Sequence, residues 1–414
     1  MRKNYLTMKS NAPKVFYAQD FRKLTKRSYN ITSTEKELNA TYGFLFKGKT
    51  VENIIKIFDL NGKLYLLKND GSLYRYDFDT SSSNIIAQGV SKDVVLVEAL
   101  KGGAIKTLII DNSGAYFEGE TQIFDMPLGH FATVFNGRVV TAKGKTVSFG
   151  NAFNFTDFSH SDLSGTVSVE NGCGDIVGLG VLDRVLYVFC ESAIFSLTAD
   201  DETVFQFKKV PVIVNGIIKN SVHALSGAIV FMQGDGTYTF NKNNVVSVNS
   251  FLSKNQFEVI GKASSYGNIY TVAVTISGGA QTYIYMYDAL SERETLIDRN
   301  VIMLADGRYL LNSTYQIYKI LERDQSIIYC LWESEKLNMN VPYQKSLLEL
   351  SVYLSEKATI TLTGQFGSKN LWLKKGFNVI PLNLCSDTFS ISMRAENKNF
   401  YASDLKLKYR VSGE

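Results

Sequence analysis

Proline and cysteine are scarce in this sequence, at 5 and 4 of 414 residues. So few prolines argue against Pro-rich linkers and leave most of the chain free to form regular structure. The cysteines are far apart and form no CxxC pair, so we expect buried free thiols and neither a metal site nor a disulfide framework. They are Cys173, Cys190, Cys330 and Cys385.

Long apolar runs are absent as well. No stretch approaches the roughly 18 apolar residues of a membrane-spanning helix. The first residues, MRKNYLTMKSNAPKVFYAQDF, contain no apolar core of the kind that a secretory signal has. The net charge is only +4, which gives no general case for nucleic-acid binding. We therefore expect a soluble protein that is made in a cytoplasm and does not insert into a membrane.

Motifs for catalysis are also missing. The sequence has 3 histidines, His130, His160 and His223, and none lies in HExxH or at metal-ligand spacing. There is no GxSxG nucleophile elbow. A glycosidase needs two carboxylates that face each other across a cleft, and a linear sequence cannot identify such a pair. We expect no enzyme, and hence no catalytic residue, metal or cofactor.

One phosphate-binding pattern does match, and we interpret the match as accidental. The residues GFLFKGKT fit GxxxxGK[ST], with Gly43, Gly48, Lys49 and Thr50 at the defining positions. A true phosphate-binding loop follows a buried, continuously apolar parallel strand, whereas residues 33–40 are polar. The bulky Phe-Leu-Phe would keep backbone amides away from a phosphate, and the chain that follows lacks alternating helices.

Aromatic and β-branched residues are what the sequence has in quantity, with 23 Tyr and 26 Phe. They occur in apolar runs of about five residues, such as Val185–Phe189 and Ala193–Leu197, separated by turns rich in Gly, Asn, Asp and Ser. Such runs suit strands and are too short for helices. Ala228–Met232 and Thr237–Phe240 follow as an apparent hairpin. These patterns predict an antiparallel, all-β protein.

A short phrase recurs along the chain and suggests a repeat. It consists of a strand, an Asp-Gly or Asn-Gly turn that favours a tight hairpin, and a Tyr-containing strand. Copies lie at Asp70–Tyr74, Asp235–Tyr238 and Asp306–Tyr309. The spacing of roughly 35–45 residues between units is typical of a propeller blade. We predict a β-propeller with six or seven irregular blades over residues 41–322.

The two ends of the chain differ from this repeat. Residues 1–40 are rich in Lys and Arg, which predicts a basic N-terminal arm with one possible strand at Val15–Tyr17, ordered only on assembly. Residues 323–414 carry segments that alternate apolar and polar residues, from LLELSVYLS to LKLKYRVS. The segments include LWLKKGFNVIPL, taken as a single strand. This end predicts a C-terminal β-sandwich after the propeller.

The order of several phrases resembles the tail nozzle and neck (head-tail) stabilization proteins of tailed bacteriophages. The opening at 16–44 is similar to the start of that family, and YCLWES resembles its Trp-containing exit from the propeller. FGNAFNFTDFS resembles a family phrase with an Asn-Pro pair, although Asn154 stands here without a Pro. Two further segments resemble family blades, at 182–201 and 209–241.

This resemblance implies a structural virion protein, made in the cytoplasm of a bacterial host. It implies a homo-oligomeric ring, hexameric in the better-known members, beneath the portal and adaptor. It also implies contacts with these or other tail proteins and the transient passage of DNA. It carries over no catalytic residue.

Two other classes of function stay open at this point. A propeller can also be a module that binds a carbohydrate or a receptor on a host surface. Less favoured is a propeller hydrolase or lyase, which would need a facing pair of carboxylates. Ring formation would separate the structural role from both alternatives.

Overall fold

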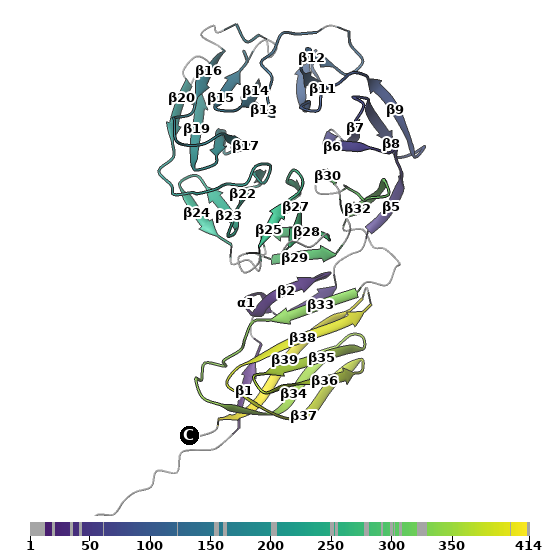
Figure 1. Ribbon diagram of the computed structural model, residues 1–414, viewed down its shortest axis with the longest axis vertical. Coiled ribbons are helices and arrows are strands. Elements are labelled where there is room, and N and C mark those ends of the chain that lie inside the picture. The colour runs from purple at the N-terminus through teal and green to yellow at the C-terminus, as the bar shows by residue number, and fades with distance from the viewer. Residues whose placement is uncertain are drawn as a thin grey trace, which may run out of the picture. The chain divides into compact units, whose positions relative to one another are not determined.

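The computed structural model describes residues 13–411 of the chain, apart from gaps (Figure 1). The gaps are residues 19–20, 34–35, 41–43, 61, 122, 153–156, 160–163, 200–204, 249–251, 253–255, 277–280, 291–292, 299–300, 302, 306–308, 321–328 and 398. Within the described part, the chain is all-β, as the sequence predicts, with one four-residue α-helix, α1 (Phe21–Leu24). Nearly all strands pair in an antiparallel manner.

The chain divides into two units. Unit 1 comprises Met1–Gly43, Arg293–Asp298 and Leu321–Glu414, and unit 2 comprises Phe44–Glu292 and Arg299–Ile320. This division differs from the expected three segments, because the N-terminal residues group with the C-terminal ones.

Unit 2 consists of small sheets formed by strands that are consecutive in the chain. The four-stranded sheets are β6–β9, β13–β16, β17–β20 and β21–β24, a three-stranded sheet is β10–β12, and β25–β28 pair with one another. A seventh group joins β30–β32 to β5. The strands are β5 (Phe44–Lys49), β6 (Ile54–Leu60), β7 (Lys63–Lys68), β8 (Leu73–Asp77), β9 (Ser82–Ala87), β10 (Val95–Lys101), β11 (Ala104–Asp111), β12 (Gly114–Phe117), β13 (Phe131–Phe135), β14 (Arg138–Lys143), β15 (Thr146–Phe149), β16 (Gly165–Ser168), β17 (Ile176–Leu182), β18 (Val185–Cys190), β19 (Ala193–Ala199), β20 (Phe205–Lys209), β21 (His223–Leu225), β22 (Ala228–Gln233), β23 (Gly236–Asn241), β24 (Asn244–Ser247), β25 (Phe257–Val259), β26 (Ser264–Tyr266), β27 (Ile269–Ile276), β28 (Thr282–Asp288), β30 (Met303–Ala305), β31 (Tyr309–Leu311) and β32 (Gln316–Ile320).

Local sequence explains these hairpins. Val185–Phe189 lies in β18 and Ala193–Leu197 in β19, and the hairpin predicted after them is formed by β22 and β23, so these predictions are confirmed. Between β13 and β14, Asn136 and Gly137 both have positive φ, 46° and 71°. A tight hairpin turn requires this backbone at both central positions, and Asn and Gly adopt it most readily.

Buried side chains join each small sheet of unit 2 to its neighbours. One cluster contains Tyr65 from β7 and Leu96 from β10, and the next contains Leu108 from β11 and Val139 from β14. Two more clusters link β13–β16 to β17–β20, and β17–β20 to β21–β24. The sheets approach closely at Gly178 on β17, where an added Cβ would lie 2.4 Å from the Cβ of Val222. These apolar seams hold neighbouring sheets together.

Further contacts connect β21–β24 through β25–β28 and β30–β32 to β6–β9, the first sheet of unit 2. The Tyr270 hydroxyl of β27 donates a hydrogen bond of 2.7 Å to the carbonyl of Ser221, beside β21. The Val301 amide, before β30, donates to Thr282 Oγ1 of β28 at 2.8 Å. A cluster that contains Leu311 from β31 then packs on β6–β9. The sheets of unit 2 accordingly follow one another around a circle (Figure 1).

β5 and β32 come from opposite ends of unit 2 and pair with each other. Tyr318 of β32 is the antiparallel partner of Phe46 in β5, and their rings meet edge to face with centroids 5.6 Å apart. The first strand of unit 2 thus completes the sheet that its last three strands begin.

Unit 1 contains two sheets. One has the order β3-β4-β39-β34-β37, with β1 also paired to β39, and the other contains β29-β2-β33-β38-β35-β36. The strands are β1 (Lys14–Tyr17), β2 (Thr25–Tyr29), β3 (Ile31–Ser33), β4 (Glu37–Ala40), β29 (Arg293–Asp298), β33 (Tyr329–Ser334), β34 (Lys345–Leu354), β35 (Ala358–Gly364), β36 (Gly367–Leu373), β37 (Gly376–Ser386), β38 (Phe389–Glu396) and β39 (Tyr401–Val411).

One apolar core is shared by both sheets of unit 1 and by the N-terminal segment. It includes Leu350 from β34 and Ile391 from β38, together with Phe21, Ile31 and Leu38. The strand predicted at Val15–Tyr17 is confirmed as part of β1, which pairs with β39. The expectation of a separate basic arm at 1–40 is therefore wrong for the described residues, because its apolar side chains fill the core of unit 1 and its strands join the sheet of β39.

Two further expectations need correction. LWLKKGFNVIPL is not one strand, because the chain turns after Leu373 and begins β37 at Gly376, whose φ is 103°. All four cysteines are free, but Cys385 is exposed, since it lies on the outward side of β37. Cys190 and Cys330 are buried, and burial raises the pKa of each thiol to about 12, which makes them unreactive at neutral pH.

Candidate functional site

Four basic side chains of unit 2 interact electrostatically although they lie far apart in the sequence. We call Lys56, Lys219, His223 and Lys262 the lysine cluster. Burial lowers the pKa of Lys56, the nearby Asp93 raises it, and the positive charge of Lys219 lowers it. Burial and then Lys56 lower the pKa of Lys262. The cluster thus joins β6 with β21 and with the segment before β26.

Two members of the cluster lie at the surface. Lys219 and Lys262 are exposed to solvent. Desolvation nevertheless lowers the pKa of Lys262. Lys56 Nζ donates a hydrogen bond of 3.4 Å to the carbonyl of Val94.

His223 is the member of the cluster that titrates in acidic solution. Its Nε2 forms a hydrogen bond of 2.8 Å with Ser265 Oγ, and burial followed by the charge of Lys262 lowers its pKa to about 4. His223 is therefore neutral at pH 7. Because the unfolded chain binds this proton more readily, the free energy of unfolding of unit 2 should fall by at most about 3 kcal/mol between pH 6.5 and pH 4.

We expect Lys262→Met to raise the pKa of His223, because one of its two depressing causes is removed. Burial is the larger cause, so the pKa should stay below the ordinary value of 6.5. An NMR titration of the imidazole protons measures the shift, and Lys242→Met, at an exposed lysine paired with Asp183 at 2.9 Å, is the control. A wild-type His223 pKa above about 6 would contradict this account.

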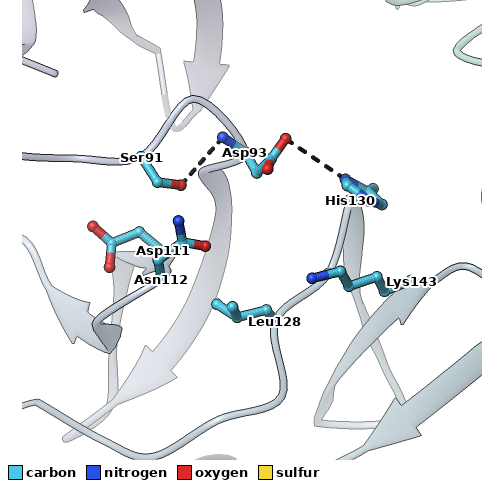
Figure 2. Close-up of a pocket in the computed structure, with 8 residues that line it drawn as sticks. Ser91, Asp93, Asp111, Asn112, Leu128, His130 and Lys143 are labelled. Atoms are coloured by element: carbon cyan, nitrogen blue, oxygen red, sulfur yellow. Dashed lines mark hydrogen bonds and ion pairs between the residues drawn. The ribbon is translucent and has the colours of Figure 1, made fainter. Parts of the chain in front are cut away.

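A second group of polar side chains lines a very small cavity between β10–β12 and β13–β16 (Figure 2). His130 Nδ1 lies 3.7 Å from the Asp93 carboxylate, while the amide of Asp93 donates to Ser91 Oγ at 3.1 Å. Asp111 accepts from the Ser113 amide and hydroxyl at 2.7 and 2.5 Å, as in an Asx turn. The cavity volume is about 10 Å³, room for one water molecule and no substrate.

The residues of the phosphate-binding pattern lie mainly in a strand. Gly48 and Lys49 belong to β5, where they pair with Ile317 and Gln316 of β32. Thr50 is buried, with its hydroxyl 3.1 Å from that of Ser83. The backbone here pairs with another strand and does not curl around a phosphate. Gly43 lies outside the described residues.

The other residues singled out from the sequence do not converge. His130 and His223 belong to the separate groups above, and His160 lies outside the described residues, as does Asn154. Among the residues that the structure describes, no three His, Cys, Asp or Glu side chains lie close enough to bind a metal ion. No described helix is long and apolar enough to cross a membrane.

A third candidate site lies in unit 1 and was not anticipated from the sequence. A groove of about 850 Å³ runs over the outward face of β33, β38, β35 and β36. Trp372 and Tyr329 line it, with side chains 85% and 42% exposed. Arg394 and Glu396 also line this groove, which we call the Trp372 groove.

Strand register fixes the order of side chains in the Trp372 groove. Thr359 of β35 is the direct partner of both Trp372 in β36 and Arg394 in β38, so the three form one row across the sheet. Two residues further along β35, Thr361 Oγ1 donates to Asn370 Oδ1 at 2.7 Å. Neighbouring strands lie about 4.8 Å apart, which places Trp372 and Arg394 roughly 10 Å from each other.

Sequence comparisons do not assign the chain to a known group. Neither protein-family models nor curated proteins give a match. Among solved structures, the chain is similar to PorZ, an essential bacterial surface component of the type-IX secretion system of Porphyromonas gingivalis, with a TM-score of 0.39 and 11% identity. The match covers 80% of this chain and 46% of PorZ, so the chain spans less than half the length of that protein. At this TM-score the likeness carries no argument.

Proposed function

We propose that this chain is a structural protein of a tailed-phage particle, which forms a ring in the tail nozzle or neck, below the portal and adaptor. In this proposal, unit 2 is a seven-bladed β-propeller and unit 1 is a β-sandwich. The protein stabilises the head-tail junction and the conduit for DNA, and it has no catalytic role.

The pairing of β5 with β32 is the observation that carries the propeller. A row of small sheets that pack side by side has a first and a last sheet. A propeller closes when the first strand of the propeller segment completes its last blade. Phe46 and Tyr318 meet at that place, and apolar seams link the other sheets in order. The shared core of the two sheets in unit 1 supports the sandwich in the same way.

The virion role rests on the order of phrases in the sequence. The phrases at 182–201 and 209–241 span the strands β18 and β19 and the strands β22 and β23, and YCLWES is β33. A propeller is a rigid disc whose loops can serve subunit contacts without altering the core. Identical subunits form a closed ring when a heterologous interface repeats with a rotation that closes.

Mass in solution tests the proposal. We expect light scattering to find a particle of about six chains of 46.3 kDa each, either for the protein alone or after a candidate connector protein is added. A ring forms by mass action, so its fraction should rise with protein concentration. If the protein stays monomeric at every concentration and does not bind portal or adaptor proteins, the ring proposal is wrong and a ligand-binding propeller is favoured.

A further inference from the structure

The Trp372 groove presents an unusual surface for a folded domain. Tryptophan is highly buried on average, yet Trp372 is 85% exposed near the end of β36, the edge strand of its sheet, where its neighbours Leu371 and Leu373 are buried. An exposed indole beside hydroxyl and amide groups offers one apolar plane and several hydrogen-bonding partners. This combination is typical of a binding site for a ligand with both apolar and polar faces.

The charged groups of the groove are available to a ligand. Lys357, Lys374 and Arg394 line it together with one carboxylate, Glu396, so positive charge prevails. Within the described part of the chain, none of the three cations forms an ion pair, whereas the adjacent Lys375 is paired with Glu356 at 3.4 Å. A guanidinium group can bind a carboxylate with two parallel hydrogen bonds.

The polar rows argue against a protein partner as the occupant. The centres of protein interfaces are depleted of charged residues and close around apolar side chains. Here the indole of Trp372 has Thr359 beside it and Asn370 two residues away, and three lysine or arginine side chains share the groove. A sugar ring has C–H groups on its face for the indole and hydroxyl groups on its edge for Thr and Asn.

We propose that the Trp372 groove binds an acidic oligosaccharide. One sugar ring stacks on Trp372, and a carboxylate of a neighbouring sugar pairs with Arg394. Lys357 and Lys374 add attraction at the end of the strands. The groove volume of about 850 Å³ lies in the range of sites that hold ligands of this size. This site lies in unit 1 and does not depend on the proposed ring.

Tryptophan fluorescence reads out the binding directly, because the chain has only 2 tryptophans and Trp332 is fully buried. We expect a galacturonate hexamer to shift the emission of Trp372 and to saturate, with weaker binding as salt rises. Maltohexaose, which has as many rings and no carboxylate, should bind at least about tenfold more weakly.

Variants locate the site. Arg394→Gln should weaken galacturonate binding at least about tenfold, and Trp372→Ala should do the same when heat of binding is measured. Lys375→Gln removes an equal charge next to the groove, and Phe366→Ala removes an exposed ring outside it, so both should stay within about twofold of the parent.

Three results would overturn the proposal. One is no shift of emission up to about 10 mM galacturonate, and another is equal affinity for both hexasaccharides. The third is a shift that appears when the protein alone is concentrated, which would make the face a contact between copies of the chain. Melting temperatures check that each variant is folded, and Trp372→Phe, which keeps a ring for stacking, should retain most of the affinity.

Discussion

A disulfide between β5 and β32 is expected to raise the free energy of unfolding of unit 2 by about 5–6 kcal/mol. The pair Phe46→Cys and Tyr318→Cys replaces two side chains whose rings already touch across the strands. Their bond would close a loop of about 270 residues, and long loops lose the most entropy in the unfolded chain. The exposed Cys385 is first replaced by serine. Denaturation of the oxidised and reduced forms of one protein gives the difference.

A short hairpin supplies the matched control for this disulfide. Leu100 and Ile105 are antiparallel partners of β10 and β11, and both are exposed. Cysteines at these positions close only a few residues, so the gain should be about 2 kcal/mol. If the pair at 46 and 318 fails to oxidise, or gains no more than the hairpin pair, then β5 does not close the set of sheets.

Trp332→Ala is expected to lower the free energy of unfolding of unit 1 by about 3–5 kcal/mol. Trp332 is fully buried, packs edge to face on Phe21 at 5.6 Å, and donates its indole N–H to Thr25 Oγ1 at 2.8 Å. Truncation leaves a large cavity and removes a partner of a part-buried hydroxyl. Urea denaturation followed by circular dichroism measures the change.

Trp372 provides a matched control for Trp332, because the same side chain is removed in both variants. Trp372→Ala removes the same atoms from an exposed position, so its cost should stay within about 0.5 kcal/mol when unfolding is followed by circular dichroism. Trp332→Ala should also make residues 13–40 easier to cleave with protease, because Phe21 loses a ring contact and Thr25 loses a hydrogen bond. A cost below about 1 kcal/mol for Trp332→Ala would show that the N-terminal segment is not held as described.

Local signals in the sequence were sufficient for the strands. The Asp-Gly turn between 228–232 and 237–240 predicted a hairpin, and the apolar run at 185–189 predicted a strand because β-branched and aromatic residues pack well on a sheet. Both features depend on neighbours within a few residues. The turn after Leu373 was missed, since Lys374 and Lys375 are not strong turn residues.

The pairing of strands that are distant in the sequence could not be predicted from such local signals. β1 pairs with β39 and β5 with β32, and no local pattern states which distant strand will be the partner. The N-terminal segment looked like a solvated arm because its basic residues are many, although Phe21, Ile31 and Leu38 are enough to anchor it in a core. The lysine cluster could not be predicted either, because Lys56 and Lys262 are far apart in the sequence and come close only in the folded unit.

The exposed position of Trp372, by contrast, can be predicted from the sequence. In an alternating strand, Leu371 and Leu373 point to one face, so Trp372 must point to the other. A tryptophan on the polar face of a predicted strand is a signal for binding. Which charges join it could not be read, because Arg394 reaches the same row through strand pairing alone.

The nesting of unit 2 within the residues of unit 1 has a consequence during synthesis. A ribosome adds about 5–20 residues per second, so β1 emerges roughly 20–80 s before the end of its partner β39. Unit 2 has all its strands once residue 320 has emerged, whereas Phe21 and Ile31 still lack a core. The nascent chain therefore exposes the apolar side chains of Phe21 and Ile31 to solvent until β39 has been synthesised.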